Sequence, residues 1–240
     1  MIRIIISHKY KFIFIKTGKT AGTSIEVYLS RYCGKDDIVT PIFPKVEGHE
    51  PRNYESLFNP FIEMLMFIEK GKIRKIRPTI LQLLKRQKFK NHLSAKRIKS
   101  RIPTDIWNNY YKFCFERNPW DKTLSQYFML RHRSNNKLTF EEYMNQEKLF
   151  PHNFHIYSDI EQENVIVDYI GKYENLNSEL SNIFSKLGIP FEGSLKVKAK
   201  GNYRKDRRPY QEFYKEKYEK YIKKVEKSFE KEIRLLNYNF

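Results

Sequence analysis

Cysteine and long apolar runs are scarce in this 240-residue sequence. Its two cysteines, Cys33 and Cys114, are too few for a disulfide framework or a four-thiolate zinc site. Both lie in apolar segments, so we expect reduced thiols in the core. No run approaches the roughly 18 apolar residues of a membrane span, and Phe12–Ile15 is closely flanked by lysines. We therefore expect a cytoplasmic protein without a signal peptide or transmembrane helix.

Acidic residues and glycine are also few. The 46 Lys and Arg against 28 Asp and Glu give a formal net charge of +18. That excess indicates an anionic partner, which is a nucleotide, an acidic glycan, nucleic acid or a membrane surface. Nine glycines and ten prolines exclude collagen-like and low-complexity chains. Aromatic residues are abundant, with 17 Tyr and 18 Phe, and the 40% hydrophobic content is enough to bury a core.

Buried strands alternate with helices along the chain. Residues 10–16 and 110–116 are apolar on both faces, as in central parallel strands, and a helical pattern follows each. Residues 165–170 predict a third strand, followed by a helix that ends at Gly188. This alternation predicts an α/β fold with a central parallel sheet flanked by helices. Without a repeat or a clear linker, we expect a single domain over residues 1–240.

Helix boundaries are also predicted by local residues. Thr23 or Ser24 is placed to cap the first helix, and Asn118 caps the second with Pro119 at its first position. Apolar residues recur every three or four positions over residues 218–236, which predicts one long amphipathic helix at the C-terminus.

The stretch 36–91 departs from this regularity. Prolines up to Pro60 predict mostly loop, and helices are expected over residues 61–69 and 79–89. Between Lys70 and Thr104 the sequence has 13 basic residues and no acidic one. This run is either a solvated helical surface or a rim that attracts an anionic substrate. We interpret residues 36–91 as a basic insertion that faces the acceptor.

The turn 17–24 has the properties of an anion-binding site. It joins a buried strand to a helix N-terminus, where backbone N–H groups and the helix dipole converge, and Lys19 adds a full charge. In the Walker A loop, G-x-x-x-x-G-K-[ST], the first glycine would fall at Ile13, inside the strand. That mismatch disfavours an ATPase, a GTPase or a phosphoryl-transfer kinase.

Two segments resemble the sulfotransferases that use 3′-phosphoadenosine-5′-phosphosulfate (PAPS). Residues 19–24, Lys-Thr-Ala-Gly-Thr-Ser, are similar to the family's P-K-T-A-G-T-S/T loop, with Gly18 in place of the proline. Residues 117–127 are similar to its R-N-P-[YW]-[DE]-R-x-x-S-x-Y segment. Residues 92–107 resemble the H-x-S-A…W segment of carbohydrate-type members, and residues 167–176 resemble V-D-F-I-G-R-F-E-N-L. The motifs occur in the family's order, so the resemblance implies a P-loop-NTPase-like sulfotransferase fold.

The resemblance also implies a donor site. The 5′-phosphosulfate end of PAPS would be held by Lys19, Thr20, Ala21, Gly22, Thr23 and Ser24. The 3′-phosphate would be held by Arg117 and Ser125. Alternatively, Arg117 pairs with a surface carboxylate and Ser125 faces solvent. Lys19 would stabilise charge on the leaving oxygen, and residues 200–204 would form a lid. No metal is implied, because His152-x-x-His155 lacks further ligands.

The acceptor, a hydroxyl of a glycan or glycolipid, needs a general base. The resemblance assigns this role to His92, which is alternatively a surface histidine of the basic run. His49, beside Glu50 in a proline-flanked loop, is the second choice. Glu26 is a third candidate, which otherwise serves as a pairing residue on the first helix. A basic nucleic-acid-binding protein without enzymatic activity is the alternative function. It fits the charge of residues 70–101 and leaves the two phosphate motifs unexplained.

Overall fold

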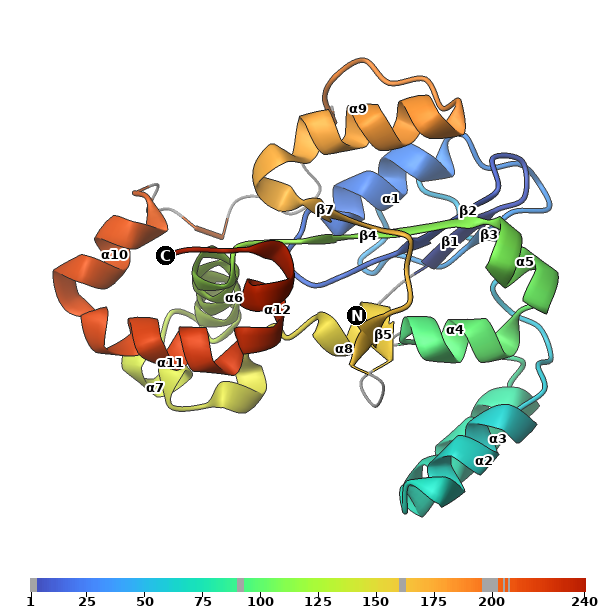
Figure 1. The fold of residues 1–240 in the computed structure, drawn as a ribbon, viewed down its shortest axis with the longest axis horizontal. Helices are drawn as coiled ribbons and strands as arrows, with labels where there is room; N and C mark the ends of the chain where they lie inside the picture. The colour runs from blue at the N-terminus through green and yellow to red at the C-terminus, as the bar shows by residue number, and fades with distance from the viewer. Residues whose placement is uncertain (1–3, 90–92, 160–162, 196–202, 205, 207) are drawn as a thin grey trace.

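The protein is a five-stranded sheet with helices on both faces (Figure 1). The computed structural model describes residues 4–89, 93–159, 163–195, 203, 204, 206 and 208–240. The sheet has the order β3-β1-β2-β4-β7. Its strands are β1 (Ile4–Ser7), β2 (Phe12–Ile15), β3 (Ile38–Val39), β4 (Tyr111–Glu116) and β7 (Tyr169–Lys172). A separate two-stranded ribbon pairs β5 (Ser158–Asp159) with β6 (Asn164–Val165).

The sheet is mixed, which corrects the prediction of a parallel sheet at one side. β2 pairs in parallel with β4, and β4 with β7, as predicted. β1 runs antiparallel to both β2 and β3. The antiparallel pairing of β1 with β2 follows from the short connection between Ser7 and Phe12, because so few residues can only form a hairpin. The third strand is predicted at residues 165–170. The strand that enters the sheet is β7, which begins at Tyr169 and pairs with β4.

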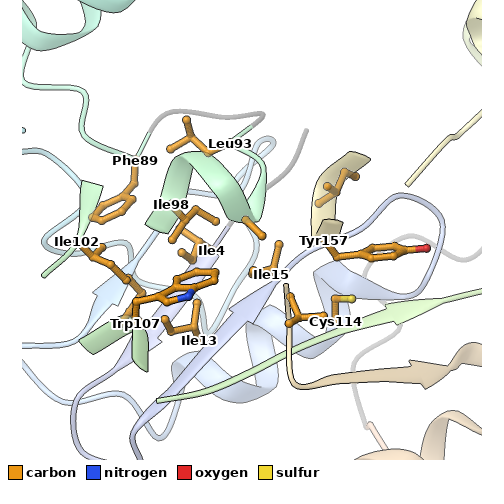
Figure 2. Packing of buried hydrophobic residues seen from close by; sticks show 14 residues of the cluster. Ile4, Ile13, Ile15, Phe89, Leu93, Ile98, Ile102, Trp107, Cys114 and Tyr157 are labelled. Carbon is orange, nitrogen blue, oxygen red and sulfur yellow. The ribbon is translucent and has the colours of Figure 1, made fainter. Parts of the chain in front are cut away.

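Alternate side chains of the central strands point to opposite faces of the sheet and pack into two different hydrophobic cores. Ile13, Ile15 and Cys114 lie on the face covered by α4 (Ala95–Arg101), α5 (Thr104–Asn109) and α8 (Phe154–Tyr157). Ile98 of α4 and Trp107 of α5 lie over Ile4 and Ile13 (Figure 2). The opposite face carries Phe12, Phe14, Phe113 and Phe115, which pack against α1 (Gly22–Ser30) and α9 (Leu176–Leu187). Both cysteines are buried free thiols, as expected.

The C-terminal helices form a third, aromatic-rich core beside the sheet (Figure 1). It is built from α6 (Pro119–Arg133), α7 (Phe140–Met144), η2 (Glu147–Leu149), α10 (Tyr210–Lys217), η4 (Glu219–Tyr221), α11 (Ile222–Ser228) and α12 (Glu230–Leu236). The single helix predicted over residues 218–236 is therefore interrupted. The break lies at Phe229, which is fully buried and stacks against the His152 ring at 4.5 Å between centroids. Burying this ring is favoured over continuing a straight helix.

A helical hairpin projects from the body (Figure 1). It consists of α2 (Phe61–Glu69), η1 (Ile73–Lys75) and α3 (Ile76–Leu84). α2 coincides with its prediction, whereas α3 begins and ends earlier than the predicted range 79–89. Glu63 attaches the hairpin to α4 through buried ion pairs with Arg97 and Arg101. In the part of the chain that the structure describes, no helix is long and apolar enough to cross a bilayer.

Candidate functional site

The loop between β2 and α1, residues 16–21, turns sharply before the helix. It overlaps the turn that is predicted to bind an anion, and is called the anion-binding loop for that reason. Lys19 and Ala21 both adopt the left-handed region, at φ 64° and 56°. α1 begins at Gly22 with Ala21 as its N-cap, and no side chain of the described residues caps it. The predicted caps Thr23 and Ser24 are therefore wrong, because both lie inside the helix. The partial positive charge of a helix N-terminus favours a nearby anion.

Lys16 passes underneath this helix terminus. Its Nζ donates to Thr23 Oγ1 and to Glu26 Oε2, each at 2.6 Å. A Cβ atom on Gly22 would lie 2.6 Å from Lys16 Cγ, so glycine is required for the lysine to pass. Glu26 is fully buried in this ion pair. The structure therefore places Glu26 in a pairing role and away from solvent.

Two residues from elsewhere in the chain fix the loop, Phe115 through its backbone carbonyl and Asn153 through its side chain. The Thr17 hydroxyl donates to the Phe115 carbonyl at the end of β4, and accepts from Thr20 Oγ1 at 2.8 Å. Asn153 binds both polar groups of the Gly18 backbone. Its Oδ1 accepts from the Gly18 N–H at 2.8 Å, and its Nδ2 donates to the Gly18 carbonyl at 3.1 Å. The backbone of the loop is therefore held before any ligand binds.

Arg117 joins the second motif to this loop. Its Nη1 donates to the Lys19 carbonyl at 3.2 Å, although the two residues are 98 positions apart. Its Nε and Nη2 donate to Asp121 Oδ2 at 2.9 and 2.7 Å. The guanidinium also lies 4.3 Å from the centre of the Tyr173 ring. Arg117 thus does pair with a carboxylate, and it does so at the edge of the anion-binding loop.

Helix α6 presents the remaining residues of the motif. Asn118 caps it as predicted, because its Oδ1 accepts from the N–H groups of Trp120 and Asp121 at 3.1 and 3.4 Å. Asp121, Ser125 and Met129 follow at four-residue intervals and therefore share one face of the helix. Lys19 Nζ lies 3.6 Å from Met129 Sδ. Ser125 is half-buried on this same face, between the residues that meet Arg117 and Lys19.

A second guanidinium reaches Asp121. Arg204 Nη1 donates to Asp121 Oδ1 at 3.0 Å. Two cations on one carboxylate leave a net positive charge, which suits an anionic ligand. Of the predicted lid at residues 200–204, Tyr203 and Arg204 are described, and residues 200–202 lie outside the described residues.

Glu116, the last residue of β4, is a buried hub that the sequence analysis did not single out. Its Oε1 accepts from the Arg117 N–H, Lys122 Nζ and Asn153 Nδ2, at 2.9, 2.7 and 3.0 Å. Its Oε2 accepts from the Tyr157 hydroxyl at 3.2 Å. The sequence does carry a sign of this role, since a charged residue ends an otherwise apolar strand. Such a charge is buried only when it is paired with other groups.

His92 and His49 are the two histidines predicted as the base. His92 lies outside the described residues. His49 is only 2% exposed, and its Nε2 donates to the Thr40 carbonyl at 2.8 Å. The adjoining Gly48 carbonyl accepts from Ser30 at the far end of α1, about 12 Å along the helix from the loop. The structure does not bring His49 to the anion-binding loop.

His152 adjoins Asn153, whose two hydrogen bonds to the Gly18 backbone form what is called the Asn153 clamp. Burial lowers its pKa, and the nearby Lys122 ammonium lowers it further. Burial, and then the proximity of His152, also lower the pKa of His155. The neutral imidazole is therefore favoured at both positions. Among the residues that the structure describes, no three His, Cys, Asp or Glu side chains are grouped to hold a metal ion.

Comparison with known proteins agrees with the two motifs. The profile of the Sulfotransferase family matches residues 3–239. The chain is 36% identical over 118 residues to an uncharacterized protein of Archaeoglobus fulgidus. The matched region covers 47% of this chain and 98% of that protein. No solved structure gives a significant match.

Proposed function

Since this chain belongs to the sulfotransferase family, we propose that it transfers the sulfuryl group of PAPS to a hydroxyl of a glycan or glycolipid. The hydrogen bond from Arg117 to the Lys19 carbonyl carries this proposal. It joins the two motifs into one surface, and PAPS carries anionic groups at two separate positions. A site for a single phosphate would need only one of them.

The proposed donor site uses both parts of this surface. The N-terminus of α1, with the backbone of residues 19–24, receives the 5′-phosphosulfate end. Arg117 and Ser125 receive the 3′-phosphate, since a guanidinium matches phosphate geometry and a hydroxyl adds one hydrogen bond. Two features of the structure support this arrangement. No described side chain caps α1, and Asp121 is shared by two guanidiniums.

The proposed reaction is an in-line displacement at sulfur. A bond forms between the acceptor oxygen and sulfur as the bond from sulfur to the 5′-phosphate oxygen breaks, and adenosine 3′,5′-bisphosphate leaves. Such a transfer mainly needs positioning and stabilisation of charge on the leaving oxygen. Lys19 is the proposed source of that stabilisation. The acceptor proton passes to a base, for which we retain His92 on the resemblance of residues 92–107 to carbohydrate-type members.

The deciding experiment is incubation of the protein with labelled PAPS and a panel of glycans and glycolipids, followed by mass detection of a sulfate increment. A second measurement, which does not need the acceptor, compares melting with adenosine 3′,5′-bisphosphate and with AMP. Ligand linkage adds about 2.7 kcal/mol at a hundredfold excess over the dissociation constant. We expect the larger upward shift with the bisphosphate. Equal shifts would remove Arg117 and Ser125 from the proposed 3′-phosphate site.

A further inference from the structure

The projecting hairpin of α2, η1 and α3 carries most of the exposed large apolar side chains among the described residues. Eleven large apolar side chains are exposed among the described residues, and nine of them lie between Leu57 and Leu84. They are Leu57, Phe61, Ile62, Leu65, Ile68, Ile73, Ile80, Leu81 and Leu84. Isolated exposed apolar residues are normal, but a concentration of this kind on one element indicates a contact surface.

The apolar residues follow the helical repeat. On α2, Phe61, Leu65 and Ile68 are spaced four and three residues apart, and therefore lie on one face. The opposite side of α2 is buried, with Glu63 held by Arg97 and Arg101 of α4. The hairpin is thus firmly attached to the body by one side while it exposes the other.

Basic residues accompany this apolar surface. Lys72, Arg74, Lys75, Arg77, Lys85 and Arg86 are all exposed on the hairpin or directly after it. Between residues 61 and 88 the sequence has two acidic residues. One of them, Glu63, is buried in ion pairs, which leaves Glu69 as the exposed one in this range. The surface is therefore both apolar and strongly cationic.

We propose that this hairpin docks on an anionic membrane surface. Its apolar side chains would enter the boundary between headgroups and acyl chains, and its lysines and arginines would contact anionic headgroups. A second copy of the chain is disfavoured because two cationic hairpins repel each other. Nucleic acid is disfavoured because eight of the nine exposed apolar side chains are aliphatic, and Phe61 alone offers a ring on which a base could stack. The proposal does not depend on the sulfuryl-transfer reaction.

The test is flotation of the full-length protein with lipid vesicles. One vesicle type is phosphatidylcholine alone, and the other contains phosphatidylcholine with phosphatidylglycerol. We expect binding to the second type that weakens as salt is raised, and little binding to the first. The double substitution Lys72→Ala with Arg74→Ala removes two exposed charges and is expected to lower partitioning on the order of tenfold.

The apolar contribution is tested with a matched pair. Leu65 on α2 is 43% exposed, and Leu235 on α12, remote from the hairpin in sequence, is 39% exposed. We expect Leu65→Asp to lower partitioning on the order of tenfold, and Leu235→Asp to leave it within about twofold. If Leu65→Asp fails to fold, Ile73→Asp replaces it, because Ile73 is 64% exposed between the two helices. Melting curves report folding for every variant.

Three results would overturn the proposal. Equal binding to both vesicle types would show that headgroup charge is not recognised. No vesicle binding, together with a concentration-dependent mass that Leu65→Asp abolishes, would make this face an interface between copies. No vesicle binding, together with salt-dependent binding of single-stranded RNA that Lys72→Ala and Arg74→Ala abolish, would make it a nucleic-acid surface.

Discussion

The Lys16 ammonium and the Glu26 carboxylate form a buried ion pair, 2.6 Å long, directly beneath the N-terminus of α1. Removing one partner of such a pair leaves an uncompensated charge, so the pair strongly constrains the path of the Lys16 side chain. Gly22 lies over that path, and its position permits no Cβ atom. The conformation of the anion-binding loop is therefore fixed by the Lys16–Glu26 ion pair, as well as by Asn153 and Arg117.

Gly22→Ala is expected to destabilise the protein. The added methyl group meets Lys16 near its backbone, while the far end of the lysine is held by Glu26, so the side chain has little freedom to move. Overpacking of this kind costs about 1–3 kcal/mol, and about 2–4 °C of melting temperature per kcal/mol in a chain of this length. Thermal unfolding measures the effect. The matched control is Gly34→Ala, because a Cβ at Gly34 would meet nothing within 4 Å. Equal melting temperatures for the two variants would contradict the packing argument.

Lys19→Ala is expected to change mainly the turnover number, and Arg117→Ala mainly the dissociation constant of the donor. Arg117→Ala should mainly raise the dissociation constant of adenosine 3′,5′-bisphosphate, since its proposed partner is the 3′-phosphate. Lys19→Ala should reduce turnover more than donor binding, because charge on the leaving oxygen develops in the transition state. Titration with the bisphosphate and steady-state kinetics measure the two effects. Arg133→Ala, at the exposed end of α6, serves as the charge-matched control. Near-normal turnover of Lys19→Ala would reject its proposed role.

His92→Ala is expected to lose activity while it retains donor binding. A general base contributes on the order of 10²- to 10⁴-fold, and it must be neutral, so wild-type activity should fall as the pH drops through its pKa. His49→Ala should lose much less, since His49 is buried at the far end of α1. If both variants stay within about threefold of the wild type, another base acts. His152 would then be tested next, because its pKa is lowered and it adjoins the Asn153 clamp.

The pH dependence of stability should report the buried His152. Burial and the Lys122 ammonium lower its pKa from the ordinary value of about 6.5. The unfolded chain therefore binds a proton more readily than the folded protein, so stability is lost as the pH falls below about 6.5. The loss stops growing once the pH is below the folded-state pKa. His152→Phe keeps a ring against Phe229 and cannot titrate. Its melting temperature should fall less than that of the wild type between pH 7 and 5, and parallel curves would contradict the assignment.

Local signals predicted the elements that carry the motifs. β4 was expected at residues 110–116 and occupies Tyr111–Glu116, and α6 begins at Pro119 under the predicted Asn118 cap. Gly188 ends α9 in the left-handed conformation, at φ 67°. These features depend on neighbouring residues, so the sequence displays them directly. The cap of α1 was mispredicted because Ala21 adopts φ 56°, a conformation set by the loop's distant partners rather than by its own side chain.

The support of the site could not be predicted, because its partners are far apart in sequence. An amide that binds a backbone, as Asn153 binds Gly18, has no required spacing and no distinctive neighbours. The two ion pairs of Glu63 and the hub at Glu116 are hidden for the same reason. Family resemblance located Lys19, Arg117 and Ser125, and the structure brings them to one surface, whereas the role of each in transfer stays a prediction.

The Asn153 clamp also sets when the site can form during synthesis. Gly18 leaves the ribosome 135 residues before Asn153 does. At about 5–20 residues per second, that delay lasts roughly 7 to 27 seconds. A nascent chain already contains both phosphate motifs by residue 127, but it lacks the amide that holds the loop. The growing polypeptide therefore passes through a long interval in which the residues of the proposed donor site are present but the loop is not yet held in place.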